Sequence, residues 1–81
     1  MFINKNGDGS LNICGAKITE LRKKQKLSQR EFADKLQMRG LDFTKNTVQR
    51  IESGKRFVTD IELAALSEYF FITADELLGR K

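Results

Sequence analysis

The sequence predicts an all-α fold, a compact bundle of five helices preceded by a short N-terminal arm or hairpin. At 81 residues, the chain has room for one domain. It contains no proline, repeat or low-complexity segment that would indicate a linker. Three capping boxes, in which a hydroxyl residue precedes a Glu by three positions, each open an apolar pattern of helical spacing. They pair Ser28 with Glu31, Thr59 with Glu62 and Thr73 with Glu76.

The first element is the arm, residues 1–14, and it raises the question of a calcium site. Its stretch NKNGDGSLNICG begins like an EF-hand loop, with Asn4, Asn6, Asp8 and Gly9 in the pattern. However, Gly15 occupies the position of the closing glutamate, and Asp8 is the only carboxylate. The Asn-Gly and Asp-Gly pairs at 6–7 and 8–9 favour tight turns between β-prone runs at 1–3 and 11–13. We therefore expect a turn or small hairpin here, and no metal.

The first two helices are expected at about residues 15–26 and from residue 28 onward. Each shows apolar residues on one stripe, at the spacing of an amphipathic helix. The apolar residues are Ile18 and Leu21 in the first helix, with Gln25 on the same stripe, and Phe32, Ala33 and Leu36 in the second.

Three further helices complete the predicted fold. The third starts at Thr44 and turns Val48 and Ile51 inward. The fourth starts at Thr59 and is apolar around much of its circumference, so we expect it to be the central helix of the core. The fifth runs over about 73–78 and stops before Gly79, a typical residue after a helix C-terminus. The apolar residues of the fourth helix are Ile61, Leu63, Ala64, Leu66 and Phe70.

The composition argues against several classes of protein. One cysteine and no histidine exclude the usual zinc sites and remove the commonest general base. The carboxylates stand in no catalytic spacing, so we expect neither an enzyme nor a cofactor. No apolar run approaches the roughly 20 residues of a membrane span, and no secretion signal follows Met1, so we expect a cytoplasmic protein. No ligand-binding domain follows, so we expect no small-molecule ligand.

Charge is unevenly distributed along the chain. The net charge is +4. Residues 17–56 carry 12 Lys and Arg against 5 Asp and Glu, whereas residues 57–78 carry 5 acidic residues and no basic one. The first part is therefore suited to a polyanion, although a solvated basic face is the alternative.

Residues 28–54 have the pattern of a helix-turn-helix, two helices joined by a short connection. Opposite its apolar side, the third helix presents an arc of basic and amide side chains without an acid. Arg and Lys bind guanine through two hydrogen bonds, and Asn and Gln bind adenine in the same way. A merely solvated helix face would be expected to carry more Glu and Lys. The pattern therefore favours readout of double-stranded DNA by Lys45, Asn46, Gln49 and Arg50, with Ser53 beside them.

Several motifs together indicate a family. They are Ile18-x-x-Leu21-Arg22, Leu27-Ser28-Gln29-x-x-Phe32-Ala33-x-x-Leu36 and Thr47-Val48-x-x-Ile51-Glu52-x-Gly54-Lys55-Arg56, followed by a Thr-x-x-Glu-Leu-Leu-Gly ending. Over about residues 15–79, the chain resembles the Cro/C1-type (XRE) helix-turn-helix family of phage repressors and bacterial regulators. The resemblance implies a lambda-repressor-like domain of five helices. It further implies a transcriptional regulator, which we expect to be a repressor acting as a homodimer on an inverted-repeat operator.

The resemblance also implies roles for individual residues. Ser28 and Gln29 open the second helix where the family contacts a phosphate, a task that suits the free amides of a helix N-terminus. Arg22 and Glu52 match a paired Arg and Glu, and each adjoins an apolar position, so we expect a sheltered ion pair. Base readout is expected from Lys45, Asn46, Gln49 and Arg50, and contacts to the DNA backbone from Ser28, Gln29, Thr44, Ser53, Lys55 and Arg56.

The connection between the second and third helices departs from the family pattern. Family members usually have seven residue steps where this chain has twelve, from Leu36 to Val48. The roughly five extra residues lie within 37–43. We expect Gly40 to end a lengthened second helix, and Leu41 and Phe43 to pack the longer turn.

A second class of function stays open. A module that kept the fold but binds another protein, as an antitoxin-like subunit would, is expected to use Phe71, Leu77 and Leu78. The same C-terminal residues, or an arm around Phe2 and Ile3, are the expected contacts of the homodimer. Steep salt dependence of duplex binding separates the two functions.

Overall fold

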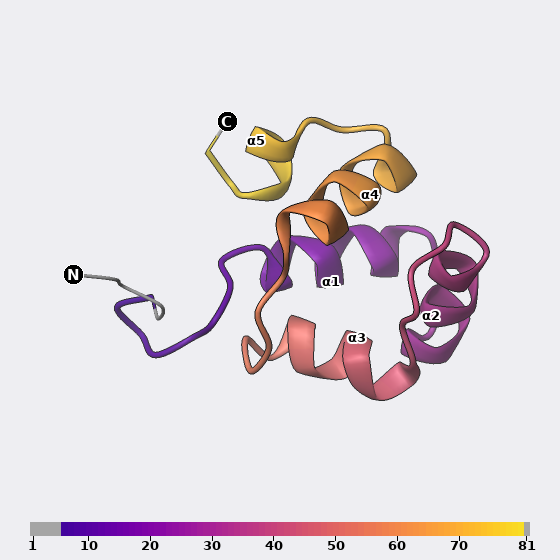
Figure 1. The fold of residues 1–81 in the computed structure, drawn as a ribbon, viewed down its shortest axis with the longest axis horizontal. Coiled ribbons are helices and arrows are strands. Elements are labelled where there is room, and N and C mark those ends of the chain that lie inside the picture. The colour runs from indigo at the N-terminus through magenta and orange to yellow at the C-terminus, as the bar shows by residue number, and fades with distance from the viewer. Residues whose placement is uncertain (1–5, 81) are drawn as a thin grey trace.

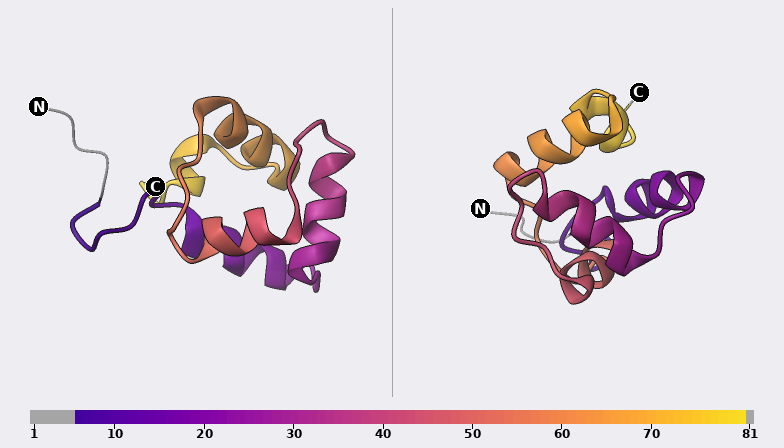
Figure 2. Two further views of the ribbon diagram at one scale, coloured as in Figure 1. Left: turned by 60° about the horizontal axis from the view of Figure 1, so that its bottom comes forward. Right: turned by 90° about the vertical axis from the view of Figure 1, so that its right-hand side faces the viewer.

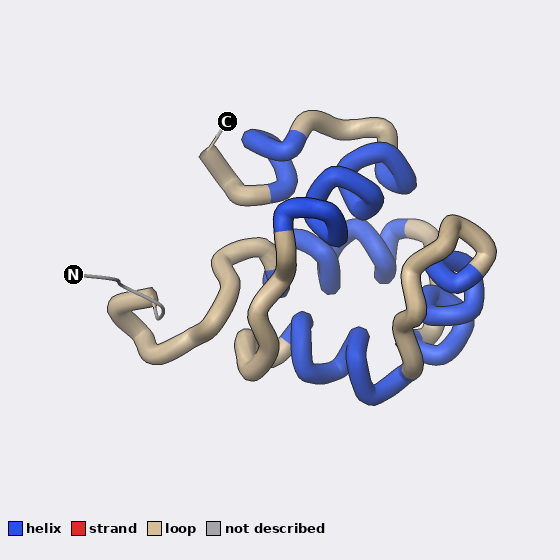
Figure 3. Tube along the Cα trace, in the orientation of Figure 1, coloured by secondary structure: helices blue, strands red, loops and turns tan. Residues whose placement is uncertain are grey.

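The computed structural model describes residues 6–80, and this part of the chain contains five helices and no strand (Figures 1 and 3). The prediction of an all-α fold with five helices is therefore confirmed. The helices are α1 (Gly15–Lys24), α2 (Gln29–Gln37), α3 (Lys45–Glu52), α4 (Asp60–Phe70) and α5 (Ala74–Leu77).

The described part of the arm forms a turn and then runs along the end of α3. The amide of Asn6 donates to the carbonyl of Ser10 at 2.7 Å, and the amide of Gly9 donates to the carbonyl of Asn6 at 2.8 Å. The amide of Leu11 then donates to the carbonyl of Gly54 at 2.8 Å. Residues 11–13 therefore do not form a strand of a hairpin. They pack instead against the segment that follows α3. The expected strand at 1–3, with Phe2 and Ile3, and the position of Asn4 lie outside the described residues.

The helix N-termini follow the capping pattern of the sequence with two differences. The boxes at Ser28 and Thr59 are complete, since the hydroxyl and the Glu carboxylate each accept a backbone amide. At Thr73 the hydroxyl accepts the amide of Glu76 at 3.1 Å, but the reciprocal bond is not formed within the described residues. Thr44 forms a box that the sequence did not predict, because the hydroxyl of Thr47 takes the role of the usual Glu and accepts the amide of Thr44 at 3.2 Å.

All five helices end in a turn closed by a residue with positive φ. The amide of this residue donates to the carbonyl three positions back, and its successor donates to the carbonyl five positions back, the hydrogen bonds of a Schellman motif. Glycine is the usual residue at this position because it has no Cβ. Here Gly40, Gly54 and Gly79 close α2, α3 and α5, whereas Lys26 (φ 58°) closes α1 and Phe71 (φ 56°) closes α4.

The second helix is not lengthened by the extra residues. Its regular part ends at Gln37, and a turn carries the chain to Gly40. The remaining extra residues bring two side chains back into the core, since Leu41 and Phe43 are buried as expected. The side chain of Gln37 donates to the carbonyl of Phe43 at 2.6 Å and holds this connection against α2. The connection is therefore longer but fixed.

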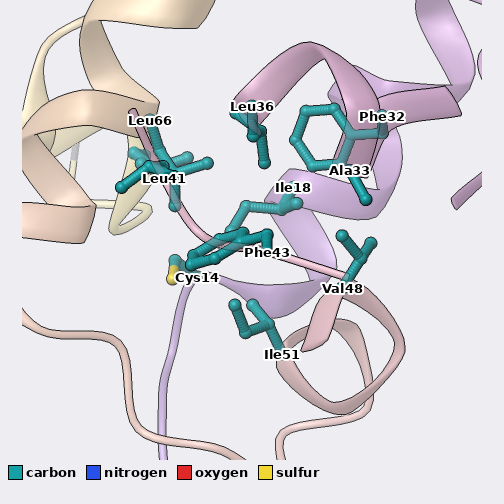
Figure 4. Packing of buried hydrophobic residues seen from close by; sticks show 11 residues of the cluster. Cys14, Ile18, Phe32, Ala33, Leu36, Leu41, Phe43, Val48, Ile51 and Leu66 are labelled. Carbon is teal, nitrogen blue, oxygen red and sulfur yellow. The ribbon is translucent and has the colours of Figure 1, made fainter. Parts of the chain in front are cut away.

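The core lies between α1, α2 and α3, with one leucine each from α4 and α5. Figure 4 shows the ring of Phe43 among Ile18, Val48 and Ile51. α4 is not the central helix, contrary to expectation, because it packs along one side only. Leu66 and Ser67 are its buried residues, and Ile61 is 76% exposed. The buried apolar residues are Cys14, Ile18, Phe32, Ala33, Leu36, Leu41, Phe43, Val48, Ile51, Leu66 and Leu77.

The helices place α3 and α4 on opposite sides of the molecule. In Figure 1, α3 runs along the lower edge and α4 and α5 lie above it, and the end view in Figure 2 shows the same separation. Within residues 6–80, no helix is long and apolar enough to cross a membrane.

Candidate nucleic-acid interface

One face of α3 is buried, and the other carries polar side chains into solvent. Val48 and Ile51 are 1% and 2% exposed and fix the rotation of the helix. Thr44 and Thr47 fix its start through the reciprocal capping bonds. The four predicted base-reading residues are all exposed, and none of their side chains makes a hydrogen bond or ion pair with the rest of residues 6–80. The structure thus brings together Lys45, Asn46, Gln49 and Arg50 on one free surface.

The only acidic residue of α3 is withdrawn from this surface. Nε and Nη2 of Arg22 donate to the two carboxylate oxygens of Glu52 at 2.7 and 3.1 Å, and only 10% and 7% of the two side chains are exposed. Nε2 of Gln29 donates to the same carboxylate at 3.0 Å, and Nη1 of Arg22 donates to the carbonyl of Leu27 at 2.7 Å. The structure brings Arg22 and Glu52 together, and this network ties α1, α2 and α3 to each other.

The sequence comparison agrees with this geometry. A family model described as Helix-turn-helix matches residues 18–77, which include all of α2 and α3. The chain belongs to the Cro/C1-type helix-turn-helix family. This is a DNA-binding regulatory family that is not typically enzymatic. No curated protein and no solved structure gives a significant match to the chain.

The two predicted phosphate contacts that follow α3 differ in whether their side chains already have a partner within the protein. Lys55 is exposed, and its side chain makes no hydrogen bond or ion pair within residues 6–80. Arg56 instead donates to both carboxylate oxygens of Glu62, at 3.0 and 3.1 Å, and its guanidinium lies 5.3 Å from the centre of the Phe43 ring. The hydrogen bond from Arg56 lowers the pKa of the Glu62 carboxyl. Lys55 is thus free to contact DNA, whereas Arg56 is bound within the protein.

The remaining predicted phosphate contacts lie where α2 begins and where α3 begins and ends. The hydroxyls of Ser28 and Thr44 accept helix amides, and the Thr44 hydroxyl also forms a hydrogen bond of 3.1 Å with the hydroxyl of Thr47. The side-chain amide of Gln29 is half-buried and bound to Glu52. Ser53 is exposed at the end of α3, with its hydroxyl 3.2 Å from the carbonyl of Arg50. These four residues flank the exposed arc at both ends of the helix-turn-helix.

One basic residue near the interface was missed by the sequence analysis. An open hollow of about 270 Å³ lies between α2 and the start of α3, and Arg30 and Lys45 line it together with Ala33, Asp34, Gln37 and Thr44. Arg30 is exposed and follows Gln29 directly on α2. Its place beside Gln29, in the first turn of a helix that faces a phosphate in the family, is the signal that could have indicated it.

Proposed function

We propose that the protein is a sequence-specific regulator that reads double-stranded DNA with the exposed arc of α3. The observation that carries this proposal is the combination of four free polar side chains on one face of a capped helix whose only acid is paired elsewhere. A helix of this kind fits the major groove, where each base pair presents its own pattern of donors and acceptors. Within the Cro/C1-type family, we further propose that the chain acts as a repressor.

We assign two classes of contact to this surface. Asn46 and Arg50 lie near the centre of the arc and are assigned to base edges, with Lys45 and Gln49 in support. Ser28, Gln29, Thr44, Ser53 and Lys55 flank the arc and are assigned to phosphates. Arg56 would have to leave Glu62 to reach DNA, so we assign it to holding the connection between α3 and α4.

We also propose that the protein is a homodimer, and the exposure of its apolar residues limits which of them can form the dimer contact. One such domain reads few base pairs, and two copies on an inverted repeat double the site. Of the C-terminal residues considered, Leu77 is fully buried and belongs to the core, whereas Phe71 is 90% exposed. Ile61 and Phe71 on the α4 side are therefore the apolar contacts that we propose. Because this side faces away from α3, pairing there leaves the reading face open (Figure 2).

The same exposed apolar residues favour a second candidate function, a protein-interaction module of the antitoxin-like kind. Selection of bound sequences from random duplex DNA distinguishes the two. A regulator enriches an inverted repeat, and its affinity for that site falls steeply with salt. No enrichment, together with weak binding that is equal for all duplexes, would contradict the proposed readout and favour the protein-interaction module.

A further inference from the structure

The arm residue Asn12 lies outside the stretch shared with the family, which begins at residue 18, yet its side chain is fully hydrogen-bonded. Its Nδ2 donates to the carbonyl of Ile51 at 3.0 Å and to the carbonyl of Arg56 at 2.8 Å. Its Oδ1 accepts the amide of Gly15, the first residue of α1, at 2.9 Å. One half-buried amide group thus joins the start of α1, the end of α3 and the chain that leaves α3.

The backbone beside Asn12 packs against the same segment. Leu11 donates its amide to the carbonyl of Gly54 at 2.8 Å. Gly54 has φ +77°, and a Cβ added there would lie 2.8 Å from the Cβ of Ser10, a distance that real Cβ atoms do not show. A Cβ on Gly15 would likewise collide with the carbonyl oxygen of Ile51. The arm and the start of α1 therefore close directly over the end of α3, in a fit that needs glycine at both places.

The two carbonyls bound by Asn12 are five residues apart and enclose residues 52–55. This short segment includes Ser53 and Lys55, both exposed and both assigned above to DNA phosphates. Because Ile51 and Arg56 are held by one rigid amide group, the backbone between them has little freedom. A charged side chain on a fixed backbone loses less conformational entropy on binding than one on a loose loop.

We propose that Asn12 is a positioning residue of the DNA interface, holding the segment after α3 so that Lys55 is placed for a phosphate contact. The inference rests on the proposed function. It requires a side chain with two donor hydrogens that can bridge two carbonyls. Asparagine has them, whereas alanine has none and serine has one.

The test is the salt dependence of binding to the selected duplex for the full chain and four variants. Asn12→Ala should make the negative slope of log K against log salt less steep by about one unit, as expected when a single phosphate is no longer bound, and Lys55→Ala should do the same. Combining the two substitutions should make the slope no shallower than either does alone, because both remove the same interaction. Asn6→Ala is the matched control in the same arm, since Asn6 is exposed and contributes only backbone bonds to the turn. It should leave the slope unchanged.

A second measurement follows the segment without DNA. The amide of Lys55, which donates to the carbonyl of Arg50 at 2.8 Å, should exchange with solvent faster in Asn12→Ala than in the wild type or in Asn6→Ala. If Asn12→Ala does not fold, Asn12→Ser replaces it, because one hydroxyl donor cannot bridge both carbonyls. Two results would overturn the positioning role in a wild-type protein that binds DNA. One is a salt slope that Asn12→Ala leaves unchanged, and the other is a double variant in which the effects of Asn12→Ala and Lys55→Ala add. A wild type without salt-dependent binding would instead overturn the proposed function itself, and the positioning role with it.

Discussion

Glu52 is the acid of α3, and its carboxylate neutralises a guanidinium that is almost fully buried. Replacing it by glutamine leaves the charge of Arg22 without a partner, which costs about 3–5 kcal/mol in a buried site. Glu52→Gln should therefore lower the melting temperature by more than about 10 °C in a domain of this size. Glu20→Gln is the control, since Glu20 pairs with Lys17 in an exposed position, where an ion pair contributes little to stability, so the melting temperature should hardly change. Equal effects of the two substitutions, seen in thermal unfolding by circular dichroism, would contradict the buried pair.

Lys26 closes α1 in a left-handed conformation that costs a residue with a side chain about 1–2 kcal/mol. Glycine relieves this strain but has more freedom in the unfolded chain, worth about 0.5–1 kcal/mol. Lys26→Gly should thus raise the free energy of unfolding by about 0.5–1 kcal/mol, measured by urea denaturation. Lys23→Gly, at an exposed position inside α1, should instead lower it by about 1 kcal/mol. A decrease in stability in both variants would show that the turn at Lys26 is not strained.

The elements differ in how far the sequence predicts them. Helix starts depend on side chains only three residues apart, so the boxes at Ser28 and Thr59 can be recognised from the sequence. The box at Thr44 was missed because a threonine hydroxyl takes the place of the usual carboxylate. The prediction that α4 is the central helix of the core was wrong. The periodicity of a sequence shows which sides of a helix are apolar but not which side packs against the rest of the protein. Ile61, one of its apolar residues, lies in solvent.

The start of α4 should make stability depend on pH. Glu62 accepts hydrogen bonds from Arg56 and from the amide of Thr59, and these lower its pKa below the ordinary value of 4.5. A carboxyl whose pKa is lowered by folding stabilises the fold above about pH 4.5, and this contribution is lost as the pH falls through the lowered pKa. Glu62→Gln should therefore cost about 1–2 kcal/mol at pH 7, and the difference from the wild type should shrink below about pH 4.5.

Urea unfolding of both proteins at about pH 7 and about pH 3 measures this difference. Glu68→Gln, on the same helix but without an ion pair within the described residues, controls for the removal of a charge as such. A difference between wild type and Glu62→Gln that is the same at both pH values would show that the carboxylate does not stabilise the start of α4.

Over the whole molecule, the sequence predicted which side chains of α3 are exposed better than it predicted how the parts of the fold pack together. The arc on α3 follows from Val48 and Ile51, because burying one side of a regular helix fixes the other. The hydrogen bonds of Asn12 to the end of α3 join residues 39 and 44 positions apart. No local pattern signals such a contact, so the sequence predicted the turn in the arm but not the packing of the arm against the end of α3. The buried state of Leu77 was missed for the same reason.

The proposed dimer should depend on the α4 side of the molecule. Phe71→Lys introduces a charge into the proposed contact, and Lys26 shows that lysine is accommodated at this backbone conformation. The dissociation constant of the dimer, measured by sedimentation equilibrium, should rise at least about tenfold, since an aromatic anchor buried in an interface contributes more than about 1.4 kcal/mol. Met38→Lys is the control, because Met38 is 85% exposed but lies after α2. If both substitutions weaken the dimer equally, or if neither does, the dimer contact lies elsewhere.

We propose that the exposed arc of α3 reads base pairs while the residues around it hold the DNA backbone. The most direct test is the base preference at each position of the selected site for wild type, Asn46→Ala and Lys55→Ala. Removing a bidentate base contact takes away about 1–3 kcal/mol of discrimination at one base pair, so Asn46→Ala should relax one position in each half-site. Lys55→Ala should weaken binding to all sequences about equally and preserve the preferences. If Asn46→Ala instead weakens binding to all sequences equally and leaves every base preference intact, Asn46 does not read a base pair.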